Sequence, residues 1–293
     1  MSEIYNKYEG SVHTPYSEIG KDDNTDPDIW GNVEYRGRKF NMYSDPGFIS
    51  ELFTESIVAG NPNKSQFLTI ADFGGSEGFV VDLVSKQLEA KGYVVRPLNV
   101  DINTDALNSG KMKHPNVQGI ESHLTQLPLV ENSVDAGLCR FVLQYMNKEE
   151  QGRFIQEAFR VLKPNGKLRI VVPATLDSVA EKPYYELYND VAAAMIGEDP
   201  EKVKQSRYTP SGHEVAEMGK SAGFSVGQQI EYTDQVRMWI SPESFASRFK
   251  IDPEILMPVF RKHKESGQLI FSEKPGSLQT RAPLCLIELV HES

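Results

Sequence analysis

One stretch, FLTIADFGGSEGF at residues 67–79, constrains the fold more than any other part of the chain. Its first five residues form a short apolar run, which is typical of a buried parallel strand. Gly74, Gly75 and Gly78 then mark a sharp loop, and the apolar residues over 79–88 recur on one face of a helix. Such a loop lets a ligand approach the backbone and the free amides at the helix start. The sequence therefore predicts a ligand site here.

Three kinds of site compete for this loop. A dinucleotide site needs Gly-x-Gly-x-x-Gly, and the glycine spacing is a poor match. A serine hydrolase needs Gly-x-Ser-x-Gly between a strand and a helix, which residues 74–78 provide, and His213 could nominally complete it. That motif usually follows several strands, however, and little before residue 67 resembles a strand.

The third kind is a nucleoside site, and it uses two acids. Asp72 ends the first strand, and Asp101 ends the next one, 29 positions later. An acid at the first position can bind the amino group of an amino-acid-like ligand, and an acid at the second can accept both hydroxyls of a ribose. The ligand would then be a nucleoside with an amino-acid tail.

The strand and helix pattern repeats along the chain, which is typical of an α/β fold with a parallel sheet. Asp45-Pro46 predicts an N-cap and the start of a helix over 46–59. Further helices are expected over 104–113, 148–162, 184–196, 211–223, 242–249 and 253–266. Strands are expected over 67–71, 93–100, 117–120, 136–141, 167–173, 224–232 and 283–291, the last of them antiparallel.

Four regions follow from this order. Residues 1–60 are expected to form an irregular aromatic-rich cap and a first helix, and residues 61–174 a Rossmann-like ligand-binding core. Residues 175–210 interrupt the alternation and are expected to form a helical and irregular lid over the sheet edge. Residues 211–293 are expected to complete the core.

Composition narrows the class of partner and compartment. The net charge of −10 argues against nonspecific binding to nucleic acid or to an anionic membrane and favours a small neutral or cationic substrate. Cys139 and Cys285 each lie in an apolar run, as buried thiols of a reducing compartment do. The first ten residues lack a signal-peptide core, and no apolar run reaches the length of a membrane span. We expect a cytoplasmic protein.

An ordered series of motifs resembles one family. Residues 71–78 are similar to an acid followed by a glycine-rich loop, with Ser76 in place of the middle glycine, and residues 99–102 are similar to a ribose motif. Residues 127–135, 140–145 and 157–168 resemble three later segments, of which the last, ending in LKPNGKL, is the most specific. The series resembles the class I S-adenosylmethionine-dependent methyltransferases, and more closely their small-molecule branch. The resemblance implies a seven-stranded sheet with helices on both faces and S-adenosylmethionine as the cofactor.

The resemblance also implies site residues. Expected cofactor contacts are Asp72, Gly74, Gly75, Gly78, Asp101, Ile102, His123, Leu124 and Arg140. His123 stands where the family often has an acid for the adenine amino group, and Arg140 could bind the cofactor carboxylate or an anionic substrate. Expected substrate contacts are Tyr43, Gln144, Tyr145 and Tyr184, and no metal ligand is expected.

The implied reaction is transfer of a methyl group to a small organic acceptor, at oxygen or nitrogen. A hydroxyl acceptor must lose its proton, so a base would help, and His213 is the best candidate by position. A protein of the same fold that binds the cofactor without methyl transfer, such as a cyclase or a binding subunit, would have a similar sequence.

Overall fold

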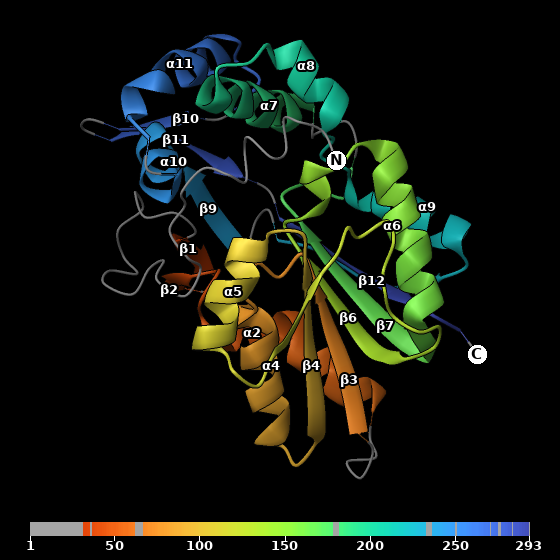
Figure 1. Cartoon of the computed structure of the whole chain (residues 1–293). Helices are drawn as coiled ribbons and strands as arrows, with labels where there is room; N and C mark the ends of the chain where they lie inside the picture. Colours follow the sequence, from red (N-terminus) through yellow and green to blue (C-terminus); the bar gives the residue numbers. More distant parts are fainter. Residues whose placement is uncertain are drawn as a thin grey trace.

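The computed structural model describes residues 32–35, 37–61, 67–177, 182–232, 236–249, 251–269, 271–274, 277–282 and 284–292. The first 31 residues of the expected cap therefore lie outside the described part of the chain. Figure 1 shows a core sheet covered by helices and a second group of helices and strands at one end of that sheet.

The core is a seven-stranded sheet in the order β5-β4-β3-β6-β7-β12-β8. Its parallel strands are β3 (Phe67–Phe73), β4 (Val94–Asp101), β5 (Gln118–Glu121), β6 (Val134–Arg140) and β7 (Leu162–Val172). The chain reverses direction at β12 (Cys285–Val290), which pairs antiparallel with β7 and with β8 (Ser225–Glu231). The expected α/β fold with an antiparallel last strand is confirmed.

Helices cover both faces of this sheet. One face carries α4 (Phe79–Glu89) and a continuous helical segment made of α2 (Pro46–Ile49), the π-helical turn η2 (Ser50–Thr54) and α3 (Glu55–Gly60). The other face carries α6 (Lys148–Val161) and α9 (Gly212–Ala222), whose apolar sides pack on the sheet (Figure 1). Helix α5 (Thr104–Lys113) follows β4. As predicted, Asp45 caps the first helix through a hydrogen bond from the Phe48 amide (2.7 Å).

A second sheet was not anticipated from the sequence. It has five antiparallel strands in the order β10-β11-β9-β1-β2. Two come from the expected cap, β1 (Asn32–Tyr35) and β2 (Arg38–Asn41), and three lie between β8 and β12, namely β9 (Val236–Ile240), β10 (Phe271–Lys274) and β11 (Ser277–Ala282). Val33 pairs with Met238, so the sheet joins segments about two hundred residues apart. Residues 236–282 thus add a layer to the region expected only to complete the core.

The remaining helices lie beside this second sheet, at the end of the core where the parallel strands finish (Figure 1). They are α7 (Lys182–Ile196), α8 (Pro200–Ser206), α10 (Pro242–Phe249), the short η4 (Pro253–Ile255) and α11 (Met257–Glu265). A buried contact joins two of them, because Asp190 of α7 accepts hydrogen bonds from Lys262 (2.7 Å) and His263 (3.0 Å) of α11. None of the helices in the described residues is long and apolar enough to cross a membrane.

Candidate functional site

The glycine loop after β3 has an unusual backbone conformation. Gly74 and Gly78 have φ of +80°, and Ser76 has φ of +53°, which side-chain-bearing residues seldom adopt. Side chains are also excluded by close neighbours: a Cβ on Gly74 would lie 2.5 Å from Val142, and one on Gly75 would overlap the Asn99 side chain. The loop therefore needs glycine at residues 74 and 75, where its backbone packs closely against Val142 and Asn99.

Asp101 connects the loop to the end of β4. Its carboxylate accepts hydrogen bonds from the Ser76 amide (2.7 Å) and the Asn103 amide (2.9 Å). The Asn99 side chain donates to the Ser76 carbonyl (2.7 Å). Burial raises the pKa of Asp101, while the backbone amides of Asn103, Ser76 and Ile102 counteract part of that rise. The loop after β3 and the end of β4 are thus hydrogen-bonded to one another.

Asp72 lies at the same edge and is 3% exposed. Burial raises its pKa to about 7, the Arg140 guanidinium counteracts the rise, and the neighbouring Asp101 carboxyl adds to it. A carboxyl with such a pKa is only partly ionised at neutral pH. A cationic group bound next to it would favour the ionised form.

A narrow cleft opens at this edge of the sheet. Five predicted contacts line it, namely Gly74, Asp101, Ile102, His123 and Leu124. Tyr145, predicted as a substrate contact, also lines it, together with Ser122, Val142, Met146 and Glu150, which the sequence analysis did not select. Of these four, Val142 lies in the 140–145 motif, and Glu150 belongs to the Asn147-x-x-Glu150 capping box of α6.

His123 lies half-buried in the cleft wall. Its Nδ1 lies 2.6 Å from the Thr125 hydroxyl, and its Nε2 lies 4.0 Å from the Glu150 carboxylate. Burial lowers the pKa of the imidazole, although Glu150 counteracts this. A neutral ring here can hydrogen-bond or stack against a flat ligand.

Arg140, at the end of β6, connects the strand to the N-terminal region. Its guanidinium donates to the carbonyls of Met42 (3.1 Å) and Tyr43 (3.3 Å) and lies 5.3 Å from the centre of the Tyr43 ring. Tyr43 is buried and packs on Phe141, with ring centres 5.4 Å apart. The structure therefore places Arg140 near Asp72 and Tyr43 against the turn that follows β6, and neither residue lines the cleft.

The other predicted substrate contacts lie on the turn after β6 and on α7. Gln144 is buried, donates to the Phe141 carbonyl (2.7 Å), and has no hydrogen-bond partner for its side-chain oxygen among the described residues. Tyr145 packs against the Arg207 guanidinium, 5.3 Å from its ring centre. Tyr184 belongs to α7, but its side chain lies outside the described residues.

The segment at residues 127–129 is held by a pair of charged residues on α6. Glu157 accepts a hydrogen bond from the Leu127 amide (2.7 Å), and Arg160 donates to the carbonyls of Leu127 and Leu129 (2.9 Å each). The hydrogen bond from Arg160 lowers the pKa of Glu157. This explains why the 127–135 and 157–168 motifs occur together.

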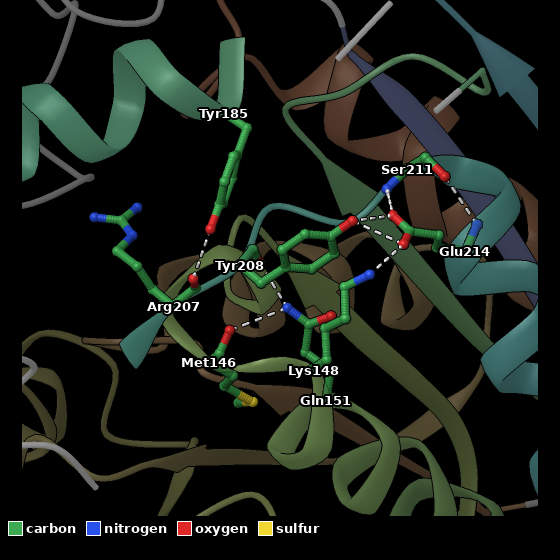
Figure 2. Close-up of polar contacts among 8 residues, drawn as sticks. All are labelled: Met146, Lys148, Gln151, Tyr185, Arg207, Tyr208, Ser211 and Glu214. Carbon is green, nitrogen blue, oxygen red and sulfur yellow. Dashed lines mark hydrogen bonds and ion pairs between the residues drawn. The ribbon is translucent and has the colours of Figure 1, made fainter. Parts of the chain in front are cut away.

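A buried glutamine joins the cleft wall to the return of the lid (Figure 2). The side-chain nitrogen of Gln151 lies within 3.1 Å of three carbonyl oxygens, those of Leu143, Met146 and Tyr208. The Tyr208 amide also donates to the Met146 carbonyl (2.8 Å). Nearer the surface, Glu214 accepts from the Tyr208 hydroxyl (2.7 Å) and from Lys148 (2.8 Å). Hydrogen bonds therefore hold residues 207–208 against the cleft wall.

His213 is not brought to the cleft. It is exposed at the start of α9, and it lines a separate groove between α6 and α9 with Lys148, Tyr208 and Glu214. The capping box formed by Ser211 and Glu214 begins the helix at Gly212, so His213 lies in its first turn, where its side chain is exposed. Its predicted role as a base is untested, and this placement does not favour it.

The hydrolase alternative requires a histidine beside Ser76. Among the described residues, no hydrogen bond joins an imidazole to the Ser76 hydroxyl. The Ser76 amide instead binds Asp101. The structure thus shows Ser76 as a loop residue and shows no catalytic pair.

Comparison with known proteins agrees with this geometry. Residues 71–170 match the family model described as a methyltransferase domain. Two relatives are ubiquinone/menaquinone biosynthesis C-methyltransferases UbiE: that of Rickettsia typhi is 25% identical over 55% of this chain and 66% of its own length. That of Agrobacterium fabrum is 24% identical over 80% of this chain and 95% of its own length.

The methyltransferase-domain match over residues 71–170, the relatives and the fold together support a class I S-adenosylmethionine-dependent methyltransferase. A solved structure extends the likeness of fold to the whole chain. Geranyl diphosphate C-methyltransferase from Streptomyces coelicolor, in complex with S-adenosyl-L-homocysteine, aligns with a TM-score of 0.55 and 12% identity over 99% of this chain and 97% of that one.

The residues of the methyltransferase site fit S-adenosylmethionine. The glycine loop leaves no room for side chains at Gly74 and Gly75, Asp101 presents a carboxylate at the end of β4, and a half-buried imidazole lies across the cleft. These are a close backbone approach, a hydroxyl acceptor and a flat surface, which an adenosine with an amino-acid tail requires. The site therefore supports S-adenosylmethionine as the cofactor.

Proposed function

We propose that the protein transfers the methyl group of S-adenosylmethionine to a small organic acceptor, at oxygen or nitrogen. The proposal rests on the contacts between residues 207–208, where the proposed lid rejoins the core, and the cleft wall. Gln151 donates to the carbonyls of Met146 and Tyr208, and Arg207 packs on Tyr145, a residue of the cleft. An acceptor bound beside the cofactor would be covered by residues of the lid. The net charge of −10 further disfavours a nucleic-acid acceptor.

We assign roles to the chain's own residues on this basis. Asp72 binds the ammonium of the amino-acid tail, Asp101 accepts the ribose hydroxyls, and Ile102, His123 and Leu124 surround the adenine. Gly74, Gly75 and Gly78 allow the backbone to approach the cofactor. Gln144 and Tyr145 face the acceptor, where the buried Gln144 oxygen can accept a hydrogen bond.

The bound cofactor supplies an electrophilic methyl on a sulfonium. The site's task is then to hold the acceptor atom in line with that methyl and to exclude water. Methyl transfer to the acceptor lone pair would leave the cofactor sulfur as a neutral thioether, and the proton of an acceptor that carries one would pass to water at the mouth of the site. No side chain has to act as a nucleophile.

A mass-spectrometric screen tests this function. The protein would be incubated with methyl-labelled S-adenosylmethionine and a panel of phenols, amines and carboxylic acids, and products would be detected by their added labelled methyl. Labelled small-molecule product, absent in the Asp101→Ala variant, is expected. Transfer to protein or RNA, with none to the panel, would contradict the small-molecule assignment.

Methylation at carbon is a second candidate, because the two UbiE relatives are named C-methyltransferases. The same labelled product distinguishes the cases, since the carbon chemical shift of a methyl differs between oxygen, nitrogen and carbon. Quinols and enols belong in the panel for this reason. Cys139 and Cys285 are buried thiols, which suits the reducing cytoplasm that we propose as the location.

A further inference from the structure

Glu77 lies inside the glycine loop but does not line the cleft. It follows Ser76 and precedes Gly78, both of which have positive φ, and it is 9% exposed. Its carboxylate accepts hydrogen bonds from the Ser109 hydroxyl (2.6 Å) and from Lys113 (2.9 and 3.2 Å). Both partners belong to α5. The side chain therefore reaches away from the cofactor, toward a helix.

The backbone of the loop also touches α5. Gly110 lies so close to the Glu77 carbonyl that a Cβ at this position would overlap its oxygen. A helix interior ordinarily disfavours glycine relative to alanine. The close approach of the loop accounts for the glycine here.

The residue after Lys113, at the end of α5, extends the contact to α4, the helix that follows the loop. His114, at the C-terminal end of α5, lies 2.8 Å from the Asp82 carboxylate through Nδ1. Asp82 belongs to the first turn of α4, and its amide donates to the Gly78 carbonyl (3.1 Å). The end of α5 thus holds the loop through Lys113 and the start of α4 through His114.

We propose that Glu77 is a positioning residue for cofactor binding, acting through Ser109, Gly110 and Lys113 of α5. The loop binds the cofactor with its backbone, and a backbone in a sparsely populated conformation keeps it only when its surroundings hold it there. The Ser76 amide is held on one side by Asp101, and Glu77 holds the loop on the opposite side. Loosening Glu77 leaves the loop in several conformations, of which only one binds the cofactor.

Calorimetry with S-adenosylhomocysteine tests the proposal, with two independent variants. Glu77→Gln removes the charge, and Gly110→Ala displaces the Glu77 carbonyl. Each is expected to raise the dissociation constant about tenfold, the size expected for loss of one charge-assisted contact. Lys113→Met should do the same, and Lys113→Arg, which keeps a cation within reach, should restore binding to within about twofold of the original.

Two matched controls separate positioning from general destabilisation. Lys111→Met changes an exposed lysine of the same helix, and Gly152→Ala changes a helical glycine of α6 whose Cβ would meet nothing within 4 Å. Both should leave affinity unchanged. In the ligand-free protein, amide exchange at residues 74–78 should be faster in Glu77→Gln than in Lys111→Met.

The two loop variants together decide the outcome. Affinity within about twofold of the original in both Glu77→Gln and Gly110→Ala would overturn the proposal. So would a loss in Lys113→Met that Lys113→Arg fails to restore. If Gly110→Ala does not fold, Glu77→Gln and the lysine pair decide the question.

Discussion

A carboxyl buried at the end of a parallel strand costs free energy when it is ionised, unless a cation compensates it. Asp72 is in this position. Its pKa is raised from 3.8 to about 7, so the folded protein holds its proton where the unfolded chain has lost it. The contribution of Asp72 therefore lowers the free energy of unfolding progressively as pH rises from about 4 to about 7. Ligand binding should have the opposite trend, because the ammonium of the cofactor needs the ionised form.

This gives a prediction for Asp72. The affinity for S-adenosylhomocysteine should increase between pH 5 and pH 7 and level off above the pKa of about 7. Asp72→Asn should bind weakly and show little pH dependence over the same range, while its stability above pH 7 exceeds that of the original protein. Calorimetric titrations and thermal unfolding across pH measure both trends. Equal pH slopes in the two proteins would contradict the role.

Asp101 has two roles, one in holding the glycine loop and one, which we propose, in binding the cofactor. Asp101→Ala removes the acceptor of the Ser76 amide and the proposed acceptor of the ribose hydroxyls. We expect the dissociation constant for S-adenosylhomocysteine to rise by about 10- to 100-fold, as for loss of hydrogen bonds to a charged group. Asp105→Ala, an exposed acid in the first turn of α5, is the matched control. Unchanged calorimetric affinity in Asp101→Ala would remove Asp101 from the cofactor site.

At the scale of elements, α6 is the part that connects the cofactor side of the molecule to the lid. Its N-terminal turn is set by the capping box of Asn147 and Glu150, and Glu150 lines the cleft. The next residue, Gln151, is fully buried and donates to the carbonyls of Met146 and Tyr208. A shift of this helix would therefore move the cleft wall and the lid return together.

Gln151→Met tests this connection. The substitution keeps the length of the side chain but removes the donor, leaving three buried carbonyls short of one hydrogen-bond partner. We expect a loss of about 2 kcal/mol in the free energy of unfolding and faster proteolysis within residues 200–211. Gln156→Met, at an exposed position of the same helix, should change neither. Denaturant unfolding and limited proteolysis measure the two effects, and equal behaviour of both variants would contradict the assignment.

For the whole molecule, the second sheet joins the N-terminal region to residues 236–282. Strand β1 lies between β2 and β9, so it holds the hairpin of the N-terminal region against the later strands. The core sheet has its own strand pairing and its own glycine loop. The proposed cofactor loop thus belongs to the core sheet, whereas the second sheet lies beside α7 and α8 of the proposed lid.

Val33→Pro is expected to separate them. Proline in the middle of a strand with partners on both sides removes a ladder hydrogen bond and disturbs the pairing. Affinity for S-adenosylhomocysteine should stay within about twofold of the original, whereas methyl transfer to an acceptor found in the screen should fall and residues 236–282 should become sensitive to protease. Val33→Ile is the matched control. A comparable loss of cofactor affinity would show that the two sheets do not act separately.

The parts of this protein that could be predicted from its sequence are local. The loop at residues 67–79, the cap at Asp45 and the strand-end acids depend on neighbours within a few residues or on periodicity, and these patterns predicted the core elements to within a few residues. The order of motifs then indicated the family.

Tertiary structure alone decided the rest, because the contacts concerned are distant in sequence. Strand β1 pairs with a strand about two hundred residues later, and neither carries a local signal for its partner. His213 and Gln151 look alike as polar residues at the starts of helices, yet one is exposed on a separate groove and the other is buried against three carbonyls. In the sequence, Glu77 has no feature that distinguishes it from other loop residues, and only the packing of α5 against the loop shows its contacts. Local patterns select elements, whereas burial and long-range packing select which side chains meet.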